Sequence, residues 1–227
     1  MFDCGFELAA LLDKIDLETA SGTQSTAEKL EQLLLSCFIA ADGLEAWCND
    51  HWTSQERRQY GLYNGGARQA HGVDPDHIAY HLEFGSILEA TSVVYYWSFQ
   101  LILNQTMLSL LRRIEEQHQV QSPFHATAAF DTAPKHPILD DTSTVESRGL
   151  YAPSQEQLAE SSLELAIDIV LAASFFLRDG TGWLGPQKLF FPLRRAMAYL
   201  GTVSTALPVQ MEAQLIFKSL IARLRVG

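Results

Sequence analysis

Two stretches of the sequence decide the fold: ATSVVYYWSFQLILN (Ala90–Asn104) and LELAIDIVLAASFFL (Leu163–Leu177). Both are apolar on nearly every side at helical spacing, and neither shows the alternation of apolar and polar residues that a half-buried strand would show. A helix that is apolar all round is normally surrounded by other helices. We therefore predict an all-α fold, a single bundle in which these two helices form the centre.

Capping signals place the starts of the other helices. The pattern Ser/Thr-x-x-Glu/Gln satisfies free N–H groups in the first helical turn, and proline is favoured there as well. The capping pattern occurs at Ser25–Glu28, Thr53–Glu56, Ser86–Glu89 and Ser154–Gln157, and the prolines that open helices are Pro186 and Pro208. These signals predict six or seven helices, over about residues 6–15, 26–48, 86–117, 154–180, 186–201 and from 208 onward, with a short one after Thr53.

A long connection interrupts this pattern. Residues 120–153, VQSPFHATAAFDTAPKHPILDDTSTVESRGLYAP, hold four prolines and many Ser and Thr residues. Irregular connections of this length in compact domains are usually functional lids or disordered insertions. We predict a proline-rich loop of one of these two kinds inside a single domain that spans residues 1–227.

Composition and charge limit the classes of function. The chain has 227 residues, 47% of them hydrophobic, and a formal net charge of −11. Nucleic-acid backbones attract clustered positive charge, so direct binding of nucleic acid is not expected. The three cysteines form no CxxC pair, which favours a reducing compartment. With no basic secretory start and no apolar run of about 20 residues, we expect an intracellular protein, nuclear or cytoplasmic, without a membrane span.

Candidate metal ligands are poorly arranged. His77 and His81 are four residues apart, as a zinc pair on a helix would be, but the glycines and proline around them leave room for barely two turns. Asp140 and Asp141 resemble an aspartate-rich magnesium motif but lie in the proline-rich connection. We predict no metal site and no cofactor.

One pair of carboxylates suggests acid–base chemistry. Asp168 interrupts the apolar run LAIDIVLAA, and Glu164 lies one helical turn earlier on the same face. A carboxylate in a central helix must be paired, hydrogen-bonded or directed into a cavity, because its bare burial is unfavourable, and a raised pKa would make it a general acid or base. Alternatively, the two residues mark the one solvated edge of the helix.

Aromatic residues suggest an apolar pocket. They are concentrated in the two central segments and in the segment after Gly180, at a density that fits either a small-molecule site or an ordinary core. The candidate lining residues are Tyr95, Tyr96, Trp97, Phe99, Phe175, Trp183 and Phe190.

Three segments together carry a resemblance to a known family. They are residues 84–114 (FGSILEATSVVYYWSFQLILNQTMLSLLRRI), residues 158–201 (LAESSLELAIDIVLAASFFLRDGTGWLGPQKLFFPLRRAMAYLG) and residues 211–224 (MEAQLIFKSLIARL). In this order they resemble the C-terminal region of fungal-specific zinc-cluster transcription factors. The middle segment carries the most recognisable part of that region, in which a helix leads to a Gly-Pro turn and then to an apolar run with Pro-Leu. Gly185, Pro186, Phe191, Pro192, Leu193 and Ala196 match it.

The resemblance implies a regulatory role, but the sequence departs from the family in one respect. The family binds DNA through a cysteine-rich binuclear zinc cluster, which this sequence lacks, so DNA binding is not carried over. The resemblance also implies that Pro192 kinks its helix and places Arg194 just beyond the kink. There we expect Arg194 to pair with a carboxylate such as Glu164, Asp168 or Asp179.

Three hypotheses follow for the function. The first is a stand-alone regulatory or effector domain that binds a protein partner, or a second copy of itself, and acts in the control of secondary metabolism. The second is a repurposed biosynthetic protein that binds an apolar metabolite and catalyses a cyclisation or isomerisation, with Asp168, Glu164 and Arg194 as its catalytic groups. The third is a truncated gene product without a selected activity.

Overall fold

The described part of the chain is entirely helical in its regular structure. In this computed structural model the described residues are 2–20, 26–52, 82, 84–121, 153–203 and 207–226. They form α1 (Phe2–Ala20), α2 (Ala27–His51), α4 (Ile87–Gln121), α5 (Gln155–Phe176), the 3₁₀ turn η1 (Asp179–Thr181), α6 (Leu184–Leu200) and α7 (Leu207–Val226). The predicted all-α bundle is confirmed.

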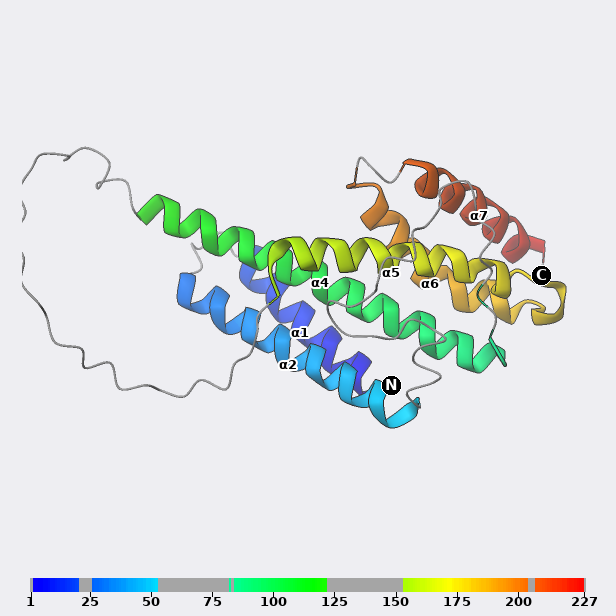
Figure 1. Ribbon diagram of the computed structural model, residues 1–227, viewed down its shortest axis with the longest axis horizontal. Coiled ribbons are helices and arrows are strands. Elements are labelled where there is room, and N and C mark those ends of the chain that lie inside the picture. Colours follow the sequence, from blue (N-terminus) through cyan, green and yellow to red (C-terminus); the bar gives the residue numbers. More distant parts are fainter. Residues whose placement is uncertain are drawn as a thin grey trace, which may run out of the picture.

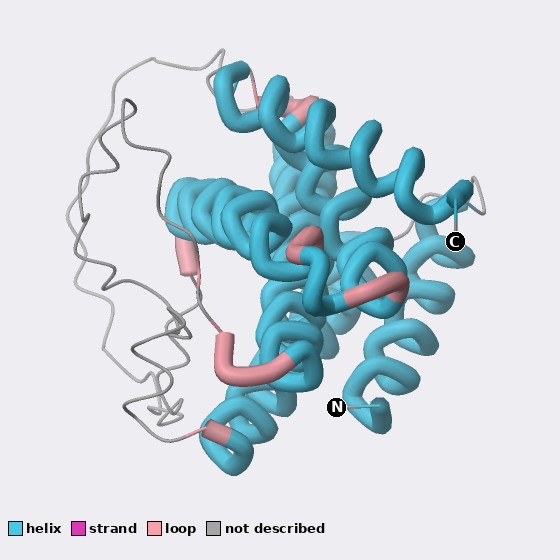
Figure 2. The backbone as a smooth tube through the Cα atoms, turned by 90° about the vertical axis from the view of Figure 1, so that its right-hand side faces the viewer, coloured by secondary structure: helices cyan, strands magenta, loops and turns pink. Residues whose placement is uncertain are grey.

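Helices α4 and α5 form the centre of the bundle, as their apolar sequences predict. They pack side by side along the long axis of the molecule, and α4 also contacts α2 and α6 while α5 also contacts α6 and α7 (Figure 1). Helix α1 packs on α2, and α7 lies outermost on α6 (Figure 2). The arrangement explains why α4 and α5 carry apolar residues on several faces, since each is covered from more than one side.

The few polar side chains inside this centre are satisfied locally. Ser98 on α4 and Ser162 on α5 are fully buried. Each hydroxyl donates to the carbonyl oxygen one turn earlier, Ser98 to Val94 and Ser162 to Leu158, at 2.7 Å in both cases. A hydroxyl bonded in this way can be buried without leaving an unpaired group.

Two of the predicted capping signals work in the structure. Ser154 and Gln157 form a complete capping box at the start of α5. At the start of α4 the Ser86 hydroxyl accepts from the N–H of Glu89, whose carboxylate reaches past the cap to the N–H of Gly85. Helix α2 differs from the prediction: its N-cap is Thr26, and that side chain makes no capping bond. Ser25 and the predicted helix after Thr53 lie outside the described residues.

Helix α5 ends earlier than predicted. We expected a left-handed glycine cap at Gly180, but the helix ends at Phe176 and the C-cap residue Leu177 has φ −96°. The physical reason is the Thr181 hydroxyl, which bonds to the carbonyl oxygens of Phe176 (2.8 Å) and Arg178 (2.7 Å) and so satisfies groups that the helix end leaves free. Among the described glycines the left-handed conformation occurs at Gly182, φ 56°.

The Gly-Pro pair belongs to a close joint between α5 and α6. Gly185 and Pro186 are both buried in the first turn of α6, one and two residues after its start at Leu184. A Cβ atom at Gly185 would clash with the carbonyl oxygen of Phe176 and with the side chain of Thr181. Glycine is therefore required here because the start of α6 touches the end of α5. Helix α6 then continues through the buried Pro192 to Leu200.

Candidate functional site

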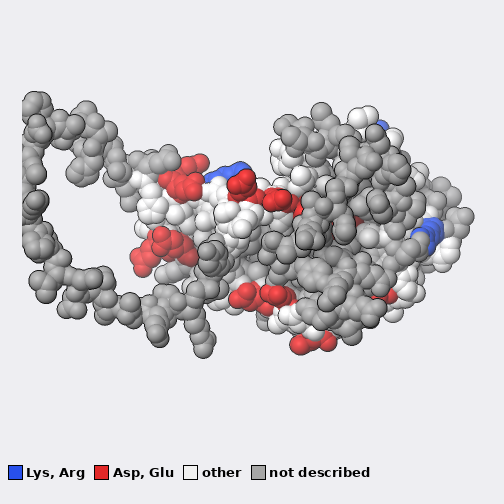
Figure 3. Space-filling model, viewed as in Figure 1, with Lys and Arg blue, Asp and Glu red and all other residues white. Residues whose placement is uncertain are grey.

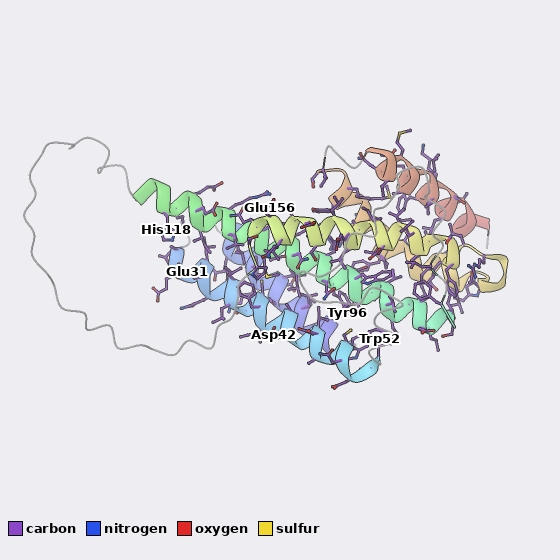
Figure 4. The ribbon with its side chains drawn as sticks, in the orientation of Figure 1. Glu31, Asp42, Trp52, Tyr96, His118 and Glu156 are labelled. Atoms are coloured by element: carbon purple, nitrogen blue, oxygen red, sulfur yellow. The ribbon has the colours of Figure 1, made fainter. Side chains whose placement is uncertain are left out.

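The predicted pocket aromatics are packed into the core rather than around one space. Tyr96 and Trp97 on α4 are 2% and 1% exposed. The Tyr96 ring lies against Trp47 and Trp52 from the end of α2 (Figure 4), with ring centroids 6.3 and 6.1 Å apart, and its hydroxyl accepts from Gln100 at 2.7 Å. The indole Nε1 of Trp97 has no hydrogen-bond acceptor among the described residues, so this ring contributes packing alone.

The remaining aromatics fall into separate contact groups. Tyr95 lies between Phe99 and Phe191, whereas Phe175 contacts Phe84 and Phe176. Phe190 of α6 stacks on Phe217 of α7, with centroids 5.5 Å apart. Tyr95 with Phe191 joins α4 to α6, and Phe190 with Phe217 joins α6 to α7, which is the packing expected of rings between helices of a core.

Trp183 differs from the other predicted pocket residues in its exposure. Its side chain is 66% exposed at the joint between α5 and α6, directly before the close approach of Gly185 to the end of α5.

The residues of the predicted acid–base group lie on two neighbouring helices, α5 and α6. Glu164 and Asp168 are half-buried on α5, and each takes part in an interaction. Arg194 is exposed on α6. Arg194 lies on the outer face of α6, whose other face is buried by Leu193 and Ala196. The expected pairing of Arg194 with Glu164, Asp168 or Asp179 stays a prediction.

A groove lies elsewhere, between α1, α2 and α4. Its volume is about 270 Å³. Leu8 and Leu11 of α1 form one wall, α2 forms the other, and Leu103 of α4 contributes from below; the residues of α2 are Ser36, Ile39, Ala40, Gly43 and Leu44. The sequence contained a signal for it that we did not use, the small residues Ser36, Ala40 and Gly43 at helical spacing on α2.

The groove offers apolar contact and no titratable group. The one hydroxyl that lines it, from Ser36, already donates to the carbonyl oxygen of Gln32 at 2.9 Å. A Cβ atom added at Gly43 would meet nothing within 4 Å, so this part of α2 is open. Such a surface suits the apolar side of a ligand or partner and cannot transfer protons.

The two helices that form the walls of the groove are predominantly acidic. Helices α1 and α2 together contain ten Asp and Glu residues and two Lys residues, a formal charge of −8 out of −11 for the whole chain. Figure 3 shows acidic groups along α2, including the region of Glu31 and Asp42 that Figure 4 labels. Asp13, Asp16 and Asp42 are all exposed. A low-dielectric groove flanked by one sign of charge attracts the opposite sign.

Burial makes the Cys37 thiol a poor nucleophile. Cys37 and Cys48 are free and buried on α2. Loss of solvation raises the pKa of the Cys37 thiol from 9.0 to about 11, so it stays protonated at neutral pH. Burial likewise raises the pKa of Tyr199, whose hydroxyl donates to the carbonyl oxygen of Ala159 at 2.8 Å and so ties α6 to α5.

Two further findings concern the described residues alone. Within them, no group of three His, Cys, Asp or Glu side chains is arranged to hold a metal ion. His77, His81, Asp140 and Asp141 lie outside this part of the chain. No helix among the described residues is long and apolar enough to cross a membrane.

Comparison of the chain with protein-family models, with curated proteins and with solved structures gave no match. The geometry of the described residues is therefore the basis on which a function is argued.

Proposed function

We propose that the chain is a regulatory domain that acts by binding another protein. The proposal keeps the role implied by the resemblance to the C-terminal region of zinc-cluster transcription factors, in which the domain would modulate a regulator that itself contacts DNA. Control of secondary metabolism remains the setting that we propose for it.

The observation that carries the proposal is a set of exposed apolar residues paired on helices. Leu35 and Ile39, one turn apart on α2, are 51% and 64% exposed, and Met211 and Leu215 on α7 are 65% and 66% exposed. Single exposed apolar residues are common on soluble proteins. Pairs at helical spacing, one of them beside an apolar groove, are typical of surfaces on which a partner helix packs.

The packing of the aromatic residues supports binding over catalysis. Tyr96, Trp97 and Phe176 are buried against other side chains. Exposed apolar pairs at helical spacing are available to a partner on α2 and α7, and the pair on α2 lies beside the groove.

A purification from the cells that make the protein tests this function. We expect the tagged chain to be isolated with a regulatory protein in a fixed ratio, and we expect deletion of its gene to change transcription of the genes that this regulator controls. Native mass spectrometry of the same sample distinguishes the biosynthetic alternative. A chain that carries a small molecule and no protein would contradict the regulatory proposal.

A further inference from the structure

One residue in the α2 wall of the groove is unusual for the middle of a helix. Gly43 lies in the middle of α2, seventeen residues after the N-cap Thr26, and has open space where a side chain would be. Glycine inside a helix lowers its stability by about 0.5–1 kcal/mol relative to alanine. Packing among the described residues does not explain why the residue is glycine, because none of them lies within 4 Å of a Cβ atom at this position.

The apolar surface extends from the groove to the outside of α2. Ile39 lines the groove and is 64% exposed, and Leu35 lies one turn before it at 51%. Small residues in the groove let another helix come close to α2, and the two larger side chains give that helix an apolar edge to contact. The surface is therefore shaped for a helix rather than for a compact small molecule.

Charge indicates what kind of helix fits. The two helices that form the walls carry a formal charge of −8, and the exposed Asp42 lies beside Ile39 and Gly43 on α2. A helix with apolar residues on one face and Lys or Arg at its flanks would match both the groove and its surroundings. A second copy of the chain would bring a net charge of −11 toward an acidic surface, so charge disfavours it as the occupant.

We propose that this groove binds a basic amphipathic helix of a partner protein. The inference rests on the proposed function and names the class of partner that the domain recognises. Apolar side chains of the partner pack over Gly43 and against Ile39, while its basic side chains lie near Asp42 and the other carboxylates of α1 and α2.

A designed peptide tests the groove directly. The probe is a fluorescein-labelled helix of about 18 residues with leucines at positions i, i+3, i+4 and i+7 and lysine or alanine elsewhere. Its affinity for the full chain is measured by fluorescence anisotropy, beside a scrambled peptide of the same composition. We expect the scrambled peptide to bind about tenfold more weakly, because it keeps the charge and loses the apolar face.

Two pairs of variants locate the contact. Gly43→Leu fills the groove and should weaken binding about tenfold, whereas Gly180→Leu, at another open glycine between α5 and α6, should leave it unchanged. Asp42→Asn should weaken binding and reduce its dependence on salt, whereas Glu156→Gln, at the exposed start of α5, should have no effect. Circular dichroism and thermal unfolding establish that all four variants fold.

Three results would overturn the inference. Equal affinity for the scrambled peptide would mean attraction by charge alone. Unchanged affinity in a folded Gly43→Leu variant would place the peptide elsewhere. A wild-type dimer that becomes monomeric on Gly43→Leu, seen by light scattering, would show that a second copy covers the groove. If a regulator is isolated from cells but the peptide does not bind as expected, the regulatory function stands and the groove is not its binding site. If no regulator is isolated and the peptide does not bind, the regulatory function is contradicted as well.

Discussion

Gly185 sets how closely two helices of the core approach each other. Its Cα lies so near the end of α5 that any side chain would meet the Phe176 carbonyl oxygen, which is backbone and cannot swing away. We expect Gly185→Ala to lower the free energy of unfolding by about 1–3 kcal/mol, the usual range for overpacking a well-packed site. Urea unfolding measures it, and Gly180→Ala, where the added Cβ meets nothing within 4 Å, is the control. Equal stability of the two variants would contradict the close joint.

The buried thiol of Cys37 predicts a loss of stability at alkaline pH. Burial raises its pKa to about 11 in the folded chain, against an ordinary value of 9.0. The unfolded thiol therefore ionises first as pH rises, and the thiol's contribution to folding, complete below about pH 9, is lost between pH 9 and 11. Plotted against pH in this window, the free energy of unfolding should fall less steeply in Cys37→Ala than in the wild type. Identical slopes would mean that the thiol is solvated.

At the scale of elements, the N-cap residues of α5 and α2 should respond differently to replacement by alanine. Ser154 accepts from the N–H of Gln157 at the start of α5, whereas Thr26 at the start of α2 makes no side-chain capping bond. Ser154→Ala should lower the free energy of unfolding by about 1 kcal/mol. Thr26→Ala should change it by only a few tenths. Chemical denaturation of both variants measures the difference, and a larger loss at Thr26 would refute the assignment.

The helices could be predicted from local sequence signals. Their ends could be predicted only where both partners of a capping pattern lie within one turn. The pattern at Ser154 and Gln157 placed the start of α5 correctly because both partners lie within one turn. The predicted end of α5 was wrong because the actual end depends on a hydrogen bond from the Thr181 hydroxyl to the carbonyl oxygen of Phe176. This contact crosses a turn and has no sequence signature. The prediction for α1 covered residues 6–15 and fell short of Phe2–Ala20, whose ends carry no capping pattern.

The candidate site was much less predictable than the fold. Sequence reasoning follows groups with distinctive chemistry, so it selected Asp168, Arg194 and the aromatic residues. The groove is made of aliphatic and small residues from α1, α2 and α4, which become a surface only when the three helices meet. Trp183 illustrates the opposite error. The aromatic composition of its segment suggested a buried side chain, but the side chain is exposed at the joint that contains Gly185.

For the whole molecule, the uneven charge predicts a salt effect on stability. The net charge of −11 repels itself, and most of it lies on α1 and α2. Because salt of about 0.1 M screens exposed charges beyond about 10 Å, we expect a higher melting temperature at about 0.2 M NaCl than at about 0.02 M. The double variant Asp13→Asn/Asp16→Asn, which removes two exposed charges, should show a smaller increase. A melting temperature that falls with salt would mean that ion pairs such as Lys29–Glu18 outweigh the repulsion.

The order in which the helices pack has a consequence for how the chain reaches this structure. Each of α1, α2, α4, α5 and α6 contacts the next described helix along the sequence, and the main contacts that skip a described helix are those of α4 with α6 and of α5 with α7. Contacts between sequence neighbours form with little loss of chain entropy, and domains rich in them fold quickly. Folding can therefore proceed by successive docking of neighbouring helices, and α1 and α2 can meet early, before α4 arrives to supply Leu103 beneath them.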